Sequence, residues 1–146
     1  MSADPFDLAR FITAQIGVFD RAVEELRAGQ KRSHWMWFVF PQVKGLGHSP
    51  MAQHYGIASL AEASAYLEHP VLGSRLELAV AAAQASPAAS LSDLFGSPDD
   101  LKFRSCMTLF AIASPEGPYR VALDRWCDGS PDHRTVELLA RGAGGQ

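Results

Sequence analysis

Five of the nine prolines in this 146-residue chain directly follow a serine. A serine at the N-cap of a helix can accept a free backbone N–H, and a proline at the first helical position gives up no hydrogen bond there. The Ser-Pro pairs therefore predict helix starts, and they divide the chain into many short helices. The pairs begin at Ser49, Ser86, Ser97, Ser114 and Ser130.

Apolar residues at helical spacing predict a long first helix. This helix is expected to start with Asp4 at the N-cap and Pro5 at the first position, and to continue for about six turns to Leu26. Gly29 fits the position after its C-cap, where glycine adopts the left-handed conformation at little cost.

The rest of the chain shows further helix signals. Ser59 and Glu62 form a capping-box pattern that opens a helix to about residue 68. The run 106–113 carries no charge, so the helix that starts at Ser97-Pro98 is expected to be the central core helix. The other helices are expected over residues 50–56, 70–83, 90–95, 118–128 and 132–141. Residues 33–39 are expected to form a short buried helix or a tight irregular run.

These signals predict an all-α fold with one domain over residues 1–146. We expect about seven to nine helices of unequal length and no sheet, because no segment alternates with a period of two. The ends, residues 1–4 and 142–146, are expected to fray. With 47% apolar and 20% charged residues, the chain has the composition of an ordinary globular domain.

Composition also excludes several classes of protein. The net charge of −3 argues against bulk nucleic-acid binding. The longest nearly apolar run is about eight residues, far short of a membrane span. The N-terminus has no hydrophobic signal core, which predicts a cytoplasmic protein. In a reducing cytosol, Cys106 and Cys127 are interpreted as small apolar fillers of helices.

The segment from Leu26 to Ala61 contains no acidic residue. It carries two of the three tryptophans, Trp35 and Trp37, and several basic residues and glycines. Aromatic rings and uncompensated positive charge in one segment indicate a concave site for a planar or anionic ligand. The alternative is that the string WMWFVF, residues 35–40, is simply core.

The ligand hypothesis assigns roles to particular side chains. The tryptophans form walls, while basic and amide groups contact a phosphate or carboxylate. On the presumed central helix, Lys102 and Ser105 share one face because they are three residues apart. Alternatively, Lys102 is a surface lysine paired with Asp99. The ligand-binding candidates are Lys31, His34, Trp35, Trp37, Gln42, Lys44, Lys102 and Ser105.

No catalytic residue, metal or cofactor follows from the sequence. The loop 45–50, GLGHSP, resembles part of a phosphate-binding loop, but no lysine follows at the P-loop spacing. The histidines at 34, 48 and 54 match no zinc pattern, and no acid or cysteine lies near them. Cys106 has no neighbour in sequence that would activate it as a nucleophile.

Three strings carry a resemblance to a known family: residues 31–49, KRSHWMWFVFPQVKGLGHS, with YGI after it; residues 100–110, DLKFRSCMTLF; and the late DGSPDHRTVELL. Together they resemble a small, mostly bacterial family of unknown function whose members are sometimes labelled calpastatin. The resemblance implies an all-helical fold and no established activity. We do not adopt the calpastatin function, because calpastatin inhibitory regions are repetitive and disordered.

Two functions remain open. In the first, an anionic or nucleotide-like small molecule binds a cleft near residues 31–55, with or without catalysis. In the second, the chain is a non-enzymatic interaction module or homo-oligomer whose protein partner is unknown. Geometry separates them: the first requires Lys31, His34, Gln42 and Lys102 to converge on one concavity.

Overall fold

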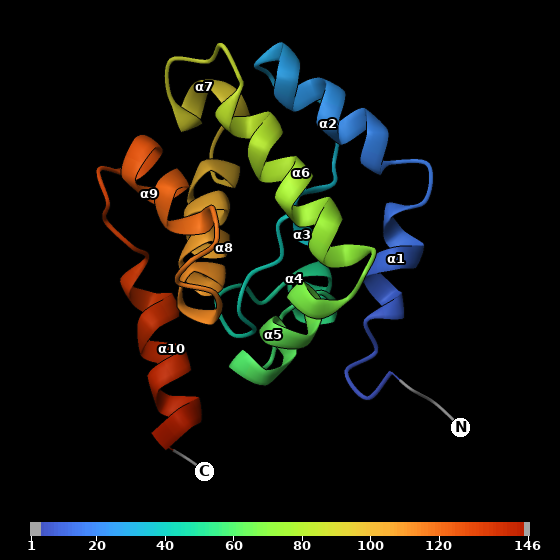
Figure 1. Cartoon of the computed structure of the whole chain (residues 1–146), viewed down its shortest axis with the longest axis vertical. Helices are drawn as coiled ribbons and strands as arrows, with labels where there is room; N and C mark the ends of the chain where they lie inside the picture. Colours follow the sequence, from blue (N-terminus) through green and yellow to red (C-terminus); the bar gives the residue numbers. More distant parts are fainter. Residues whose placement is uncertain (1–3, 145–146) are drawn as a thin grey trace.

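The computed structural model describes residues 4–144, with side chains through Arg141. Within this range the chain forms ten α-helices and no strand, around one hydrophobic core (Figure 1). The predicted all-α, single-domain fold is confirmed. The helices are α1 (Ala9–Gln15), α2 (Phe19–Ala28), α3 (Met36–Val39), α4 (Pro50–His54), α5 (Leu60–Glu68), α6 (Leu72–Gln84), α7 (Leu91–Phe95), α8 (Asp99–Ala113), α9 (Tyr119–Cys127) and α10 (His133–Gly144).

The helix count exceeds the predicted seven to nine because the expected first helix is divided. Gly17 has a φ of 72°, in the left-handed region, and it separates α1 from α2. The predicted cap at Asp4 is wrong, because α1 begins at Ala9 and has Leu8 at its N-cap. The Asp4 carboxylate accepts the N–H groups of Leu8 and Ala9 at 2.7 and 2.9 Å from outside the helix. Gly29, with a φ of 88°, ends α2 as predicted.

The prolines lie at or between helix ends, but only one Ser-Pro pair has the predicted cap geometry. Ser49 accepts the N–H of Ala52 at 3.1 Å, and Pro50 is the first residue of α4. The hydroxyl of Ser86 instead accepts an N–H two residues ahead, a local turn that competes with helix capping. The other three pairs differ as well. Pro98, rather than Ser97, occupies the N-cap of α8, and Ser114 is the C-cap of the same helix. At the start of α10, Asp132 rather than Ser130 accepts the N–H of Thr135.

Helix α8 is the centre of the fold, as the sequence predicted. It packs against α5, α7, α9 and α10 (Figure 1). Its buried side chains meet the α3 segment, where Phe40 lies 5.1 Å from Phe103 between ring centroids. The core interpretation of WMWFVF also holds for five of its six residues, because only Trp37 is partly exposed.

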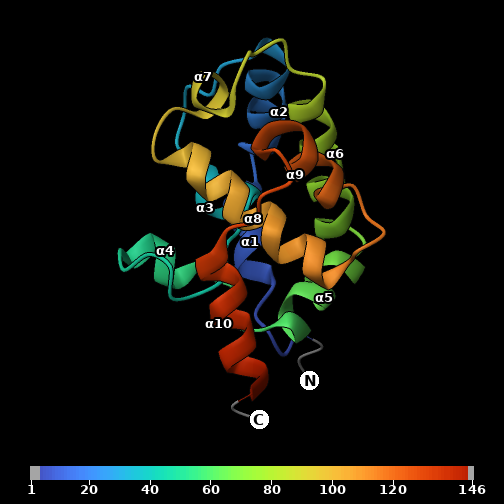
Figure 2. The ribbon, with the colours of Figure 1, turned by 90° about the vertical axis from the view of Figure 1, so that its left-hand side faces the viewer.

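The segment between α3 and α5 positions the candidate site. Its two ends form an isolated parallel bridge between Val43 and Ile57. The Ile57 N–H donates to the Gln42 carbonyl, and the Lys44 N–H donates to the Ile57 carbonyl, both at 2.8 Å. The chain between these ends carries α4, which stands out from the other helices (Figure 2).

Residues 1–3 and 145–146, where fraying was predicted, lie outside the described residues, and that prediction stays untested. The main chain of α10 continues to Gly144. None of the helices in the described part of the chain is long and apolar enough to cross a membrane.

Candidate functional site

A cleft of about 360 Å³ lies between the loop after α3, helix α4 and the N-terminal half of α8. Its volume falls within the usual range for small-molecule sites, about 300–1,000 Å³. Four of the predicted candidates line it: Trp37 and Gln42 from the α3 side, and Lys102 and Ser105 from α8. The other lining residues are Leu46, Gly47, His48, Ser49, Ala52, Pro98, Leu101 and Asp132.

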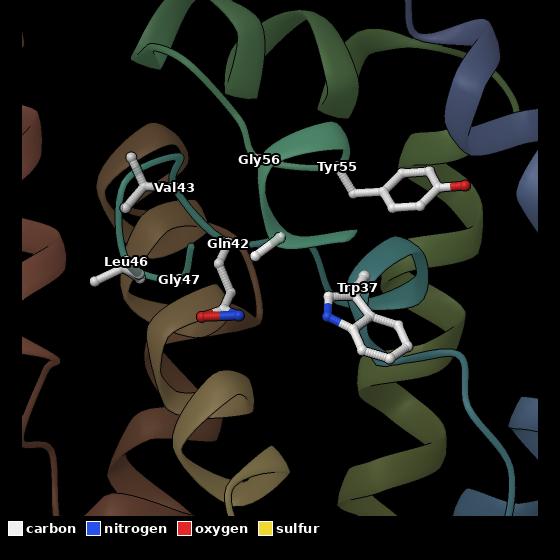
Figure 3. Close-up of a pocket in the computed structure, with 8 residues that line it drawn as sticks. Trp37, Gln42, Val43, Leu46, Gly47, Tyr55 and Gly56 are labelled. Carbon is white, nitrogen blue, oxygen red and sulfur yellow. The ribbon is translucent and has the colours of Figure 1, made fainter. Parts of the chain in front are cut away.

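A narrow recess adjoins the cleft and shares Trp37, Gln42 and Leu46 with it. Figure 3 shows the Gln42 side chain and the Trp37 indole on facing sides of this recess, with Tyr55 and Gly56 above them. The recess measures about 10 Å³. Because this is about the space of one water molecule, the recess itself is too small for a ligand.

Lys102 is fixed over the aromatic wall of the cleft. Its Nζ lies 4.9 Å from the centroid of the Trp37 ring, within the range of a cation–π interaction. The same Nζ lies 3.3 Å from Asp99 Oδ1. The predicted pairing with Asp99 is therefore present, and the lysine still lines the cleft, with 25% of its side chain exposed.

Asp99 also pairs with a second lysine. Lys31 Nζ lies 2.9 Å from Asp99 Oδ2, and only 8% of the Lys31 side chain is exposed. The same Nζ lies 5.1 Å from the centroid of the Trp35 ring, which belongs to the core. Two ammonium groups thus share one carboxylate, which leaves one positive charge uncompensated, and Lys102 is the more exposed of the two.

The absence of acids in segment 26–61 did not imply an absence of partners. Glu25, one residue before the segment, accepts the N–H groups of Arg32 and Ser33 and the indole N–H of Trp35, at 2.7 to 3.0 Å. It also accepts the Ser33 hydroxyl. Burial acts to raise the pKa of Glu25, but these hydrogen bonds outweigh it and lower the pKa to about 2.

A second acid pairs at the other end of the segment. Glu62 Oε2 lies 2.7 Å from Arg10, whose guanidinium also donates to the carbonyls of His54 and Gly56. This acid does not compensate the basic residues of the segment, because its partner Arg10 lies outside the segment. Within the segment, Lys31 forms an ion pair, with Asp99 of α8. The excess positive charge at the cleft belongs to Lys102, which also lies outside the segment.

The structure separates the eight candidates into two groups. Trp37, Gln42, Lys102 and Ser105 converge on the cleft. Of the four residues that the ligand hypothesis expected to meet, Gln42 and Lys102 do, and Lys31 and His34 do not. Trp35 is 0% exposed and belongs to the core, and Lys31 is buried in its ion pair. His34 is exposed and is not among the cleft residues, while Lys44 lines a different hollow together with Arg10 and His54.

Two acids at or beside the cleft were not among the predicted candidates. Asp99 was named as a partner of Lys102, and residue 132 as the start of a helix. Asp132 lies in the DGSPDHRTVELL string, whose distinctive pattern was the available signal. Its position beside α8 depends on the packing of α10 on α8, which the sequence does not state.

The cleft offers groups for binding. Lys102 supplies a positive charge, and the Gln42 amide supplies a donor and an acceptor. The Ser105 hydroxyl donates to the Leu101 carbonyl at 3.1 Å, so its lone pairs can still accept a hydrogen bond. Cys106 is buried away from the cleft, and its burial raises its pKa well above the usual thiol value. No group of His, Cys, Asp and Glu side chains suited to a metal occurs among the described residues.

The fold and the cleft define a small, single-domain, all-helical protein with a candidate small-molecule site between α4 and α8. Residues 5–139 match the family described as "Protein of unknown function (DUF1810)", and the chain belongs to that family. The predicted membership of a family of unknown function is thereby confirmed.

A crystal structure with the same fold comes from Mycobacterium tuberculosis, where the protein is described as the conserved hypothetical protein Rv1873. It is 53% identical in sequence and has a TM-score of 0.91. The match covers 94% of this chain and 99% of the other. No significant match was found among curated proteins. The name calpastatin occurs in none of these comparisons.

Proposed function

We propose that this protein binds a small molecule through an anionic group in the cleft between Trp37 and Lys102. The observation that carries the proposal is the shared carboxylate of Asp99. Since Lys31 and Lys102 both pair with it, one positive charge is left over, at the edge of a cleft of about 360 Å³. An anion placed there compensates that charge in a partly desolvated setting, where the attraction is stronger than in bulk water.

The walls of the cleft support the same function. Trp37 and Leu46 provide apolar surface, and Gln42 and Ser105 provide a few polar groups that orient a ligand. This combination is typical of small-molecule sites. Trp37 is held in place by the ammonium over its ring, so the wall exists before a ligand arrives.

The test is a calorimetric and thermal-shift screen with inorganic phosphate, citrate, nucleotides and ADP-ribose. We expect at least one anion to raise the melting temperature, and Lys102→Gln to weaken its binding by about tenfold, or 1.4 kcal/mol. Lys44→Gln is the matched control, because it removes the same charge from a hollow outside the cleft. If no anion or other small molecule binds, or if both variants weaken binding equally, the proposal is wrong.

The second function, an interaction module or homo-oligomer, has less support. The large exposed apolar side chains include Ile16, Leu78, Leu101 and Val121, which come from different helices or loops. Single exposed apolar residues are normal on a protein surface. Light scattering tests this alternative, which predicts a mass above that of one chain.

A further inference from the structure

We infer that the ligand of the cleft is a zwitterion of the amino-acid type, whose carboxylate contacts Lys102 and whose ammonium group contacts Asp132. This inference rests on the binding function proposed above and adds the chemical class of the ligand. It starts from Asp132, an acid in the wall of a cleft whose other charged residue is a lysine.

Asp132 is held firmly in position. Its backbone N–H donates to the hydroxyl of Thr108 on α8 at 2.8 Å. Its Oδ2 accepts the N–H of Thr135 at 3.0 Å and also the Thr135 hydroxyl. Thr108 and Thr135 are 1% and 0% exposed, so the carboxylate is anchored to the interior of the protein.

The charge of Asp132 is not neutralised by a neighbouring cation. It makes no ion pair with any side chain of residues 4–141, and its Oδ1 has no hydrogen-bond partner there. Lys102 lines the same cleft but pairs with Asp99 instead. The cleft therefore presents one fixed negative charge and one excess positive charge that do not meet each other.

These two charges select for a ligand that carries both signs. A simple anion attracted by Lys102 also experiences repulsion from Asp132, and a simple cation experiences the reverse. A molecule with a carboxylate and an ammonium group compensates both charges at once. Such specificity arises because a ligand with the wrong charge is repelled, as well as because a ligand with both charges is attracted.

The remaining walls fit the rest of such a molecule. Trp37, Leu46 and Leu101 offer apolar surface to a side chain, and Gln42 and Ser105 offer hydrogen bonds. The volume of about 360 Å³ lies near the small end of the range for ligand sites. A free amino acid suits this space better than a dinucleotide does.

The first experiment screens the standard free L-amino acids by ligand-observed NMR and calorimetry. The tightest binder is then compared with its N-acetyl derivative, which has lost the ammonium charge, and with its amide, which has lost the carboxylate. We expect each blocked form to bind about tenfold more weakly than the free amino acid. Equal binding of the free and N-acetyl forms would overturn the inference.

Two variants assign each charge to its residue. Asp132→Asn keeps a side-chain acceptor suited to the N-cap of α10 but removes the charge. It should weaken binding of the free amino acid and should not weaken binding of the N-acetyl form, because it removes a repulsion from the carboxylate. Lys102→Gln should weaken binding of the free form and should not weaken binding of the amide, because it removes a repulsion from the ammonium group. Glu137→Gln is the control, because it removes an exposed charge from α10 away from the cleft.

The outcomes separate this inference from the proposed function. If phosphate or a nucleotide binds in a Lys102-dependent way and no amino acid does, the anion site stands and the zwitterion is excluded. If neither class binds, both proposals are wrong. Melting temperatures of the variants show whether each is folded, so a lost fold is not mistaken for a lost ligand.

Discussion

The ammonium of Lys31 lies 2.9 Å from the carboxylate of Asp99. This contact joins the acid-free segment to the first turn of the central helix, and it brings Lys102 into the same charge cluster. One carboxylate thereby fixes two lysines that occupy different environments. Lys31 is enclosed by the core, and Lys102 faces the cleft.

The Lys31–Asp99 pair should contribute measurably to stability. We expect Asp99→Asn to lower the free energy of unfolding by about 2–4 kcal/mol, because Lys31 then keeps a nearly buried charge without its partner. Urea unfolding measures the change. Asp124→Asn removes half of an exposed pair with Arg120 and should change the value by less than about 0.5 kcal/mol. Equal effects of the two substitutions would contradict this prediction.

Glu25 should give the protein a specific sensitivity to acid. Its pKa is lowered from 4.5 to about 2 in the folded state. Its contribution to stability is therefore complete above the unfolded pKa of 4.5 and is lost as the pH falls from there towards 2.

Glu25→Gln should reduce stability near neutral pH by about 1–2 kcal/mol, allowing for solvent screening at this partly exposed group. It should also flatten the fall in stability over the acid range. Urea unfolding at a series of pH values checks this, with the exposed neighbour Glu24→Gln as control. An unchanged slope in Glu25→Gln would rule out the assigned role.

Gly73, near the start of α6, should not tolerate a side chain. Alanine usually stabilises a helix relative to glycine by about 0.5–1 kcal/mol. Here a Cβ atom would lie 2.1 Å from the backbone oxygen of Leu67, where no side-chain rotation relieves the clash.

We therefore expect Gly73→Ala to be destabilising by more than about 2 kcal/mol in thermal or urea unfolding. Ser74→Ala, at the next, exposed position, should change stability by less than about 1 kcal/mol. A stabilised Gly73→Ala variant would show that α5 and α6 do not approach as closely as described.

The two cysteines should differ in reactivity. Cys106 is fully buried and burial raises its pKa, whereas Cys127 is partly exposed. Burial also raises the pKa of Cys127, although the charge of Arg104 acts to lower it. The reaction of this thiol with a disulfide reagent should therefore accelerate as the pH is raised. Ellman's reagent should modify one thiol in the native protein and both in urea. Cys127→Ser should abolish the native reaction, and a residual reaction would place Cys106 within reach of solvent.

Local signals in the sequence predicted the helices well. The cap at Ser59 has the expected hydrogen bond, because the two residues that form it are three positions apart. The division of the first helix at Gly17 was not predicted, since the apolar spacing continues through it. A single glycine inside a periodic pattern does not by itself show where a helix ends.

The candidate site was only half predictable, for a physical reason. Trp35 and Trp37 are two residues apart, so in a helical segment they point in different directions. The sequence does not show which of the two faces the core. In the same way, the pairing of Asp99 with Lys31 and the position of Asp132 beside α8 depend on tertiary packing, which no spacing along the chain reveals.

The bridge between Val43 and Ile57 makes most of one wall of the cleft a separate, closed segment of the chain. Two hydrogen bonds of 2.8 Å close the base of the segment that carries Leu46, Ala52 and the rest of one wall. The opposite wall belongs to α8, in the centre of the core. Insertions or exchanges within residues 45–55 can therefore reshape one side of the binding site while the other side, with its fixed charges, is inherited unchanged. Selectivity in such a fold can diversify by loop replacement, provided that Leu46 and Tyr55 keep their packing against the core.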